Sequence, residues 1–327
     1  MAEQGLPTGV VSDVQMLAGG TQNILVSFTL GHASYVLRRP PIHKRDNSDE
    51  TMRREARILA ALKDTEVPHP ALIAQCPDTS VIGAAFYLMA PVAGFNPTLS
   101  WPDGADTQRM ARTIGLSMVD AIAALGRVEP EAVGLADFGR SQGWLERQCE
   151  RWGRLLTSYE RLAGFRSCLT GAGKLEAWLR DHRPSAWRPG LIHGDFQFSN
   201  VIVEPDGSRL AAIVDWELAS IGDPLLDLGH MLATWPTSET PPPAVVFDTP
   251  GLPSRDELIE RYRCGSSRDV GNIDWYQVLA CFRLASILEG SYARAKAGLA
   301  PLETGNRLHG IAIALFEEAR MIAEIDR

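Results

Sequence analysis

The sequence of 327 residues predicts an α+β protein with two lobes, a small N-terminal antiparallel sheet with one helix and a larger, mainly helical C-terminal lobe. Three observations support this fold class. Residues 14–40 alternate in the manner of strands, whereas beyond Gly94 apolar residues recur at helical spacing. The chain is also longer than one small core requires. We therefore expect an N-terminal lobe at residues 1–91 and a C-terminal lobe at residues 92–327.

The N-terminal lobe is expected to begin with three strands, at residues 14–17, 24–30 and 34–37. Gly19, Gly20 and Thr21 fall in the break between the first two strands. A plain hairpin turn suits these residues, and so does a loop that cradles a phosphate with its backbone N–H groups and the Thr21 hydroxyl. Pro40 and Pro41 end the third strand, because proline cannot donate to a β-ladder.

A helix is expected next, from Asn47 or Ser48 to about Lys63. Its inward stripe is apolar and consists of Met52, Ala56, Leu59 and Leu62 or Lys63. Glu55 lies near the middle of this helix. It is either a surface glutamate paired with arginines of its own helix or the partner of Arg38 in the preceding strand.

The later elements follow the same two periodicities. An apolar strand is expected at residues 84–89, and short strands at residues 191–192, 200–203 and 210–214. Helices are expected at residues 106–125 and 143–162, from Asp223-Pro224 onward, and at residues 255–264, 273–296 and 307–325. Residues 237–250 are rich in Pro, Thr and Ser and are expected to be irregular and flexible.

The helix at residues 143–162 has two opposite stripes. Its apolar stripe is Leu145, Cys149, Trp152, Leu156 and Tyr159. The other stripe is basic and consists of Arg147, Arg151, Arg154 and Arg161. This geometry predicts that most of the arginines face solvent and do not form an anion site.

Residues 191–217 carry the strongest chemical signal. Asp195 and Asn200 stand in the spacing His-x-Asp-x-x-x-x-Asn, and Asp215 follows an apolar strand. Phosphoryl transfer from a metal-bound triphosphate needs a carboxylate that accepts the proton of the attacking hydroxyl, and an amide oxygen with a second carboxylate that hold Mg²⁺. The pattern predicts Asp195 as the catalytic base and Asn200 and Asp215 as the metal ligands.

These motifs resemble the aminoglycoside phosphotransferase family, which is similar in fold to the protein kinases and choline kinases. The resemblance is carried by three motifs, His193-Gly194-Asp195 with Asn200, Val214-Asp215-Trp216-Glu217 and Gly222-Asp223-Pro224-Leu225-Leu226-Asp227. It covers about residues 14–325. The resemblance is closest to the branch that includes the kinase-like domain joined to certain acyl-CoA dehydrogenases, through Val36–Pro41, Arg54–Arg57, Val133–Asp137 and Gly143–Leu145.

The resemblance implies a two-lobed protein-kinase-like fold that uses ATP and Mg²⁺. It places Gly19, Gly20 and Thr21 in the loop over the triphosphate, although the Gly-x-Gly-x-x-Gly pattern is absent. A cation is implied on the third strand, where Arg38, with Arg39 as the alternative, replaces the usual lysine and is held by Glu55.

The segment Leu88–Gly94 is similar to the family hinge. There the Ala90 carbonyl would accept from the adenine amine and the Val92 N–H would donate to the ring, while Pro91 stands where no donor is required. Asp227 resembles the acid that braces the catalytic loop. His230, one turn later, is expected to be a packed core histidine.

Composition limits the partners. The net charge of −8 argues against nucleic acid, which needs a basic face. The five cysteines are scattered, so neither a disulfide framework nor a zinc site is expected. The first residues lack the features of a signal peptide and no apolar run is long enough to cross a membrane, which favours a cytoplasmic protein. We expect a monomer or homodimer.

The expected reaction is transfer of the ATP γ-phosphate to a hydroxyl of a small molecule. A protein that binds nucleotide with little turnover and a metal hydrolase using Asp195 and His193 are the rivals. Residues 239–327, expected beside the acceptor, hold thirteen acidic and ten basic residues, too few acids for a polycationic aminoglycoside. A neutral or anionic metabolite is favoured, and the branch suggests a hydroxyacyl-CoA. Arg283, Glu289 and Tyr292 either line the acceptor pocket or simply pack.

Overall fold

The computed structural model describes residues 5–17, 23–44, 46–162, 165–167, 169, 171–236 and 249–325. Gly19, Gly20 and Thr21, expected over the phosphates, lie outside the described residues. The same is true of most of the segment 237–250, expected to be irregular.

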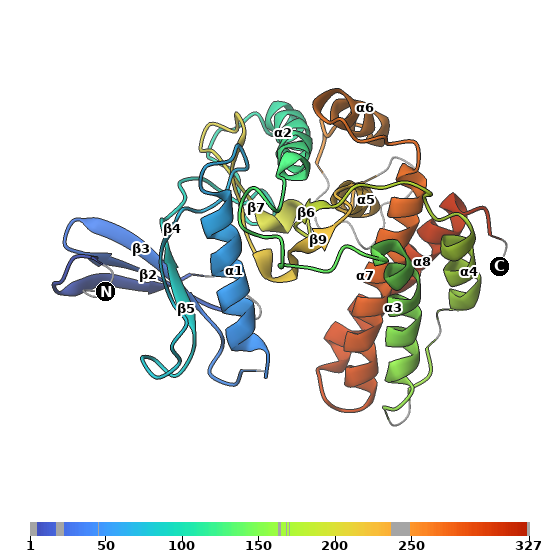
Figure 1. The fold of residues 1–327 in the computed structure, drawn as a ribbon, viewed down its shortest axis with the longest axis horizontal. Helices are drawn as coiled ribbons and strands as arrows, with labels where there is room; N and C mark the ends of the chain where they lie inside the picture. Colours follow the sequence, from blue (N-terminus) through green and yellow to red (C-terminus); the bar gives the residue numbers. More distant parts are fainter. Residues whose placement is uncertain are drawn as a thin grey trace.

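An antiparallel sheet of five strands forms the N-terminal part of the described chain, in the order β1-β2-β3-β5-β4 (Figure 1). Its strands are β1 (Val11–Met16), β2 (Ile24–Leu30), β3 (Ala33–Arg39), β4 (Leu72–Cys76) and β5 (Phe86–Met89). The small antiparallel sheet predicted from the sequence is confirmed, although β1 begins three residues earlier than expected. Strand β4 was not predicted, because its residues are mostly half-buried and show no clear alternation.

Helix α1 (Ser48–Leu62) packs against the sheet, next to β5 (Figure 1). Met52, Ala56, Leu59 and Leu62 are buried along one stripe, as the helical period predicts. Lys63 is exposed, so Leu62 completes the inward stripe. This packing fixes the face of α1 that carries Glu55, which is itself only 1 % exposed.

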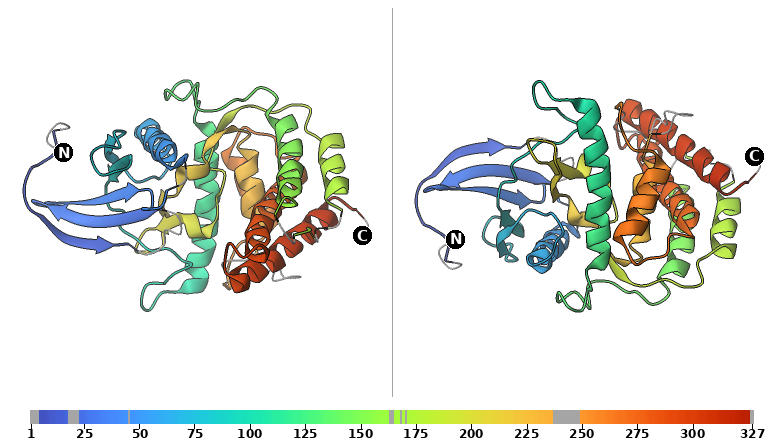
Figure 2. Two further views of the ribbon diagram at one scale, coloured as in Figure 1. Left: turned by 90° about the horizontal axis from the view of Figure 1, so that it is seen from below. Right: turned by 90° about the horizontal axis from the view of Figure 1, so that it is seen from above.

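The rest of the described chain is mainly helical. Its helices are α2 (Thr107–Arg127), α3 (Trp144–Tyr159), α4 (Ala172–Asp181), α5 (Leu225–Ala233), α6 (Arg255–Gly265), α7 (Ile273–Lys296) and α8 (Leu302–Ile322). Helix α2 stands between the sheet and the other helices (Figure 2). The short helix α4 was not predicted, and α8 begins directly after Pro301, earlier than expected. None of the described helices combines the length and apolar character that crossing a bilayer requires.

Two small strand pairs lie between the sheet and the helices (Figure 1). Strand β6 (Gly190–Ile192) pairs with β9 (Ser220–Gly222), and β7 (Val201–Val203) pairs with β8 (Leu210–Ile213). Short 3-10 turns precede β7 at Phe198–Asn200 and follow β8 at Trp216–Leu218. Strand β9 was not predicted, because three residues show no periodicity. These pairs place the loops after β6 and β8 at one end.

A tight approach joins the segment after β5 to this central hairpin. Phe95 and Val203 exchange backbone hydrogen bonds of 2.9 and 2.8 Å. Gly94 has a φ of 148°, and a Cβ there would lie 2.1 Å from the Val203 carbonyl oxygen. Only glycine fits this position, because both the backbone conformation and the space exclude a side chain.

Helix α1 also contacts the helical part through two arginines. The Arg54 guanidinium donates to the carbonyls of Phe138 and Ala219, each at 3.2 Å, and lies over the Phe138 ring. Arg57 pairs with Asp137 and donates to the Gly134 carbonyl at 2.9 Å. Residues 54–57 and 133–137, two of the segments that carry the resemblance, therefore form one contact between α1 and the helical part.

Candidate active site

The loop after β6 holds Asp195 through its backbone. The Asp227 carboxylate on α5 accepts hydrogen bonds from the N–H groups of His193 at 2.7 Å and Gly194 at 2.8 Å. Gly194 has a φ of 83°, a backbone conformation that favours glycine. The chain therefore turns sharply just before Asp195. Asp227 thus has the bracing geometry that the sequence suggested.

Asp195 is held as a carboxylate. Its Oδ1 lies 3.2 Å from both Gln197 Nε2 and His230 Nε2, and its Oδ2 accepts from Asn200 Nδ2 at 2.9 Å. Burial acts to raise the pKa of Asp195, but His230 and Arg283 outweigh it and keep that pKa below its usual range. At neutral pH the side chain can therefore accept a proton, which a general base requires.

Asn200 is oriented by the same network. Its Nδ2 donates to the Asp195 carbonyl at 2.8 Å as well as to the carboxylate, so its Oδ1 is left as an acceptor. Asn96 holds the turn beneath it, because the Asn96 amide donates to the carbonyls of Phe198, Ser199 and Val201. The residue predicted as a metal ligand thus has its oxygen available for that role.

Asp215 follows β8 in a left-handed backbone conformation, with φ 66° and ψ 64°. Its side chain is 39 % exposed, and its Oδ1 lies 2.5 Å from Arg38 Nη2. The next residue, Trp216, packs its ring edge-on against His193 with centroids 4.8 Å apart. The loops after β6 and β8 are therefore packed against each other, which fixes Asp195 relative to Asp215.

Arg38 and Glu55 form a buried ion pair between β3 and α1. Arg38 Nε lies 2.9 Å from Glu55 Oε2, and the Tyr87 hydroxyl donates to the same carboxylate at 2.8 Å. Burial acts to lower the pKa of Arg38, but Glu55 and Asp215 raise it above its ordinary value. Burial raises the pKa of Glu55 to about 7, against the opposing effect of Arg38.

Arg39 has a different environment. Its guanidinium donates to the backbone carbonyls of Pro40 at 3.1 Å and Ile82 at 3.4 Å. The structure therefore brings Arg38, and not Arg39, to Glu55 and Asp215. The strand register decides this choice, because Val36 and Arg38 share the buried face of β3.

The acidic groups in this region suit a divalent cation. Oxygens of Glu55, Asp215 and Glu217 all lie within 4.8 Å of one another. Arg38 contacts only one oxygen of Asp215, and Oδ1 of Asn200, which accepts a long hydrogen bond of 3.4 Å from the Ser199 hydroxyl, adds an amide oxygen of the kind that Mg²⁺ binds. Asp215 and Asn200 fit the metal on this chemistry, while Glu55 is committed to Arg38 and Tyr87.

The segment after β5 leaves two backbone groups available. The Ala90 N–H donates to the Ala71 carbonyl at 2.9 Å, which fixes the turn. Among the described residues, neither the Ala90 carbonyl nor the Val92 N–H takes part in a hydrogen bond. These are the two groups that the resemblance to the family hinge implies would contact adenine.

Three contacts of the site were not found from the sequence. Tyr87 binds Glu55, Asn96 holds the turn before Asn200, and His230 approaches Asp195. His230 is fully buried, as expected of a core histidine, and it lies three residues after Asp227 on the same face of α5. That i,i+3 spacing was a usable signal, because Asp227 was already assigned to the catalytic loop.

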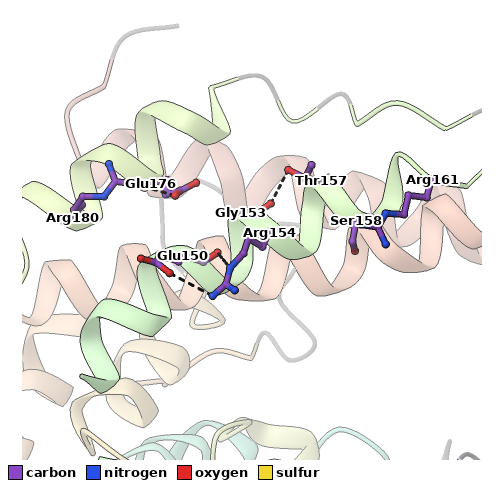
Figure 3. Close-up of a pocket in the computed structure, with 8 residues that line it drawn as sticks. All are labelled: Glu150, Gly153, Arg154, Thr157, Ser158, Arg161, Glu176 and Arg180. Atoms are coloured by element: carbon purple, nitrogen blue, oxygen red, sulfur yellow. Dashed lines mark hydrogen bonds and ion pairs between the residues drawn. The ribbon is translucent and has the colours of Figure 1, made fainter. Parts of the chain in front are cut away.

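A separate hollow lies elsewhere, between α3 and α4 (Figure 3). It has a volume of about 630 Å³ and includes Glu150, Arg154, Glu176 and Arg180 in its lining. Those side chains pair with one another, Arg154 with Glu150 at 3.5 Å and Arg180 with Glu176 at 3.0 Å. None of the site residues named above lines it, so we assign it no part in the chemistry.

Comparison with known proteins identifies the family. Residues 13–258 match the family model described as the phosphotransferase enzyme family. The chain belongs to this family. Asp195, Asn200 and Asp215 all lie within the matched residues.

Relatives of the phosphotransferase domain occur in longer proteins. Acyl-CoA dehydrogenase family member 11 of Gallus gallus is 31 % identical over 95 % of this chain and 40 % of its own length. The human member 11 is 32 % identical over 84 % of this chain and 35 % of its own length. Probable acyl-CoA dehydrogenase IBR3 of Arabidopsis thaliana is 31 % identical over 89 % of this chain and 37 % of its own length. The chain thus spans well under half of these relatives.

Solved structures show the same fold. A protein from Ralstonia eutropha, provisionally named an aminoglycoside phosphotransferase, superposes with a TM-score of 0.78 at 28 % identity, over 96 % of this chain and 94 % of that one. Aminoglycoside 2'-phosphotransferase-IIIa in its GDP complex superposes with a TM-score of 0.63 at 15 % identity, over 98 % of this chain and 96 % of that one. The predicted kinase-like fold, with an N-terminal sheet and a mainly helical C-terminal part, is confirmed.

Arg38→Lys is expected to lower the rate of phosphoryl transfer by about tenfold or more, because charge-assisted hydrogen bonds contribute about 1.5–3 kcal/mol and lysine lacks the planar fork that reaches both Glu55 and Asp215. Arg39→Ala is the matched control and should stay within about 0.5 kcal/mol of wild type in unfolding free energy. Steady-state kinetics measures the transfer rates of the two variants, and denaturant unfolding measures their unfolding free energies. A larger rate loss in the Arg39 variant would reverse the assignment.

Proposed function

We propose that this chain transfers the γ-phosphate of ATP to a hydroxyl group of a small molecule. The observation that carries the proposal is the Asp195 carboxylate, held ionised and hydrogen-bonded to Asn200, in a loop packed against the one that carries Asp215. In the reaction the acceptor oxygen attacks the γ-phosphorus and its proton passes to Asp195. The bond to the bridging oxygen breaks, and ADP leaves with that electron pair.

The residues of the site divide the work between them. Asp195 would position and deprotonate the acceptor, Arg38 would approach the phosphates, and Glu55 with Tyr87 would hold Arg38 in place. Asn200 and Asp215 would hold Mg²⁺, which supplies charge neutralisation at the phosphates when bound. Catalysis in this arrangement depends on positioning and electrostatics.

We also propose how the nucleotide is bound. Residues 1–91 form the nucleotide lobe and residues 92–327 the catalytic and acceptor lobe. The Ala90 carbonyl and the Val92 N–H, which have no hydrogen bond within the described chain, would face the adenine. Gly19, Gly20 and Thr21 would cover the phosphates. Structural neighbours bound to AMP-PNP and to GDP support a nucleotide but leave its base open.

The acceptor is proposed to be a hydroxylated metabolite. One structural neighbour holds hygromycin B and another kanamycin, which are polycationic. The acceptor side of this chain lacks the acid cluster that several ammonium groups would need when they lose water. The dehydrogenase-linked relatives instead favour a hydroxyacyl-CoA. We propose that the chain acts in the cytoplasm as a monomer or homodimer.

The experiment that tests the function is ADP formation in the presence of Mg-ATP and a panel of aminoglycosides, sugars, amino alcohols and hydroxyacyl-CoA esters. Acceptor-dependent ADP release with a phosphorylated product supports the proposal. Arg38 in place of the usual lysine favours the rival, a nucleotide-binding protein with weak turnover. Mg-ATP binding by calorimetry without any phosphorylated product would establish that rival.

A further inference from the structure

Arg283 on α7 is a buried cation without a bonding partner. The residue is 6 % exposed, and within the described part of the chain its guanidinium makes no hydrogen bond and no ion pair. A guanidinium carries five N–H donors and stays charged in proteins. The Arg283 nitrogens are not among the buried polar atoms that lack a partner, so they keep contact with solvent. A guanidinium that is open to solvent and unpaired within the described chain can take an anion as its partner.

Arg283 shares the ring of Trp152 with a second arginine. The guanidinium lies 5.4 Å from the ring centroid of Trp152, and Arg151, which is exposed, lies 4.7 Å from the same ring. The buried Trp152 Nε1 likewise has no hydrogen-bond partner among the described residues. Donors of Arg283, Trp152 and Arg151 thus lie where α3 packs against α7.

The carboxylates nearest to Arg283 are already engaged. Asp195 and Asp227 are close enough to act on its charge and oppose the lowering of the Arg283 pKa by burial. Asp195, however, contacts His230, Gln197 and Asn200, while Asp227 accepts from two backbone N–H groups. Neither lies within ion-pair distance of the guanidinium. Arg283 is next to the base but is not neutralised by it.

We propose that Arg283 binds an anionic group of the acceptor, with Arg151 at the entrance, so that the substrate is a hydroxylated carboxylate or phosphate ester. This rests on the proposed function and specifies its substrate class. A planar guanidinium matches a carboxylate or a phosphate through two parallel hydrogen bonds. The anion would supply the missing acceptors while the hydroxyl at the other end reaches Asp195. A cationic acceptor would be repelled at the same place.

The test uses ω-hydroxy compounds of three to six carbons that differ only at the far end, which is a carboxylate, a phosphate, a methyl ester or an ammonium group. We expect the wild-type protein to prefer the two anionic ends in kcat/KM. Arg283→Gln should raise KM for these by roughly 30-fold or more, while KM for the esters changes little. Any effect on kcat through Asp195 should be the same for anions and esters. Arg283→Lys should recover part of the loss. The anionic end with the higher kcat/KM in the wild-type protein, carboxylate or phosphate, identifies the group that Arg283 binds.

Arg154→Gln is the matched control, because Arg154 lies on the solvent face of α3. Thermal unfolding and Mg-ATP affinity verify that each variant is folded. The proposal is overturned if the wild-type protein does not favour anionic ends, or if Arg283→Gln lowers kcat/KM equally for anions and esters, since Arg283 would then serve only Asp195.

Calorimetry with the same compounds and Mg-AMP-PNP separates this proposal from the proposed function. Anion binding that depends on Arg283, without phosphorylation of any compound, would support the anion site and reject the phosphotransfer. Phosphorylation of esters and anions with equal efficiency would support the phosphotransfer and reject the anion site.

Discussion

Asp195→Asn is expected to reduce phosphoryl transfer by about 10²–10⁴-fold, the usual contribution of a general base. The amide has nearly the same shape as the carboxylate but cannot accept the hydroxyl proton. Because Asp195 acts on the acceptor, the affinity for Mg-ATP should stay close to that of the wild-type protein. Single-turnover kinetics gives the first quantity and calorimetry the second.

A matched control for this change is Asp206→Asn. Asp206 is exposed in the turn between β7 and β8, where it accepts from the Ser208 N–H at 2.9 Å. The Asp206→Asn change should leave both the transfer rate and the affinity for Mg-ATP unchanged. If Asp195→Asn kept more than about a tenth of the wild-type rate with chemistry limiting, the base would have to be another group, and His230 would be the first to examine.

Much of this site could be predicted because its chemically important residues lie close together in the sequence. Asp195 and Asn200 are five residues apart on one loop, and Asp215 ends the next strand pair. The N-terminal sheet and α1 were predictable for a similar reason, since strand and helix periods appear directly in the sequence. Arg38 could be preferred to Arg39, because one strand face carries every second residue.

The remaining features depend on tertiary contacts. Arg38 and Asp215 are separated by 177 residues, and Arg54 reaches Ala219 across 165 residues. No local pattern indicates such pairs. Strands β4 and β9 and helix α4 were missed because short or half-buried segments carry too little periodicity. The solvent-facing interpretation of the arginines on α3 holds for Arg151 and Arg154, whereas Arg147 is half-buried.

Asp215→Asn is expected to lower turnover by about 10²-fold or more, because a metal-bound carboxylate supports several kcal/mol of charge stabilisation in the transition state. Unlike Asp195→Asn, it should also weaken Mg-ATP binding and raise the Mg²⁺ concentration needed for half-maximal rate. Arg38 should stay ordered in this variant, since it retains Glu55 at 2.9 Å. Calorimetry and a Mg²⁺ titration of the rate measure both effects.

Glu217→Gln distinguishes between the two acids on this loop. Glu217 lies with Asp215 in the group of oxygens that fall within 4.8 Å of one another, so it is the other carboxylate that could take the metal. We expect Glu217→Gln to alter the Mg²⁺ dependence less than Asp215→Asn, because Asp215 stands at the position where the sequence pattern predicts the metal ligand. The reverse order, with Mg-ATP affinity unchanged in Asp215→Asn, would assign the metal to Glu217 and leave Asp215 as a partner of Arg38 alone.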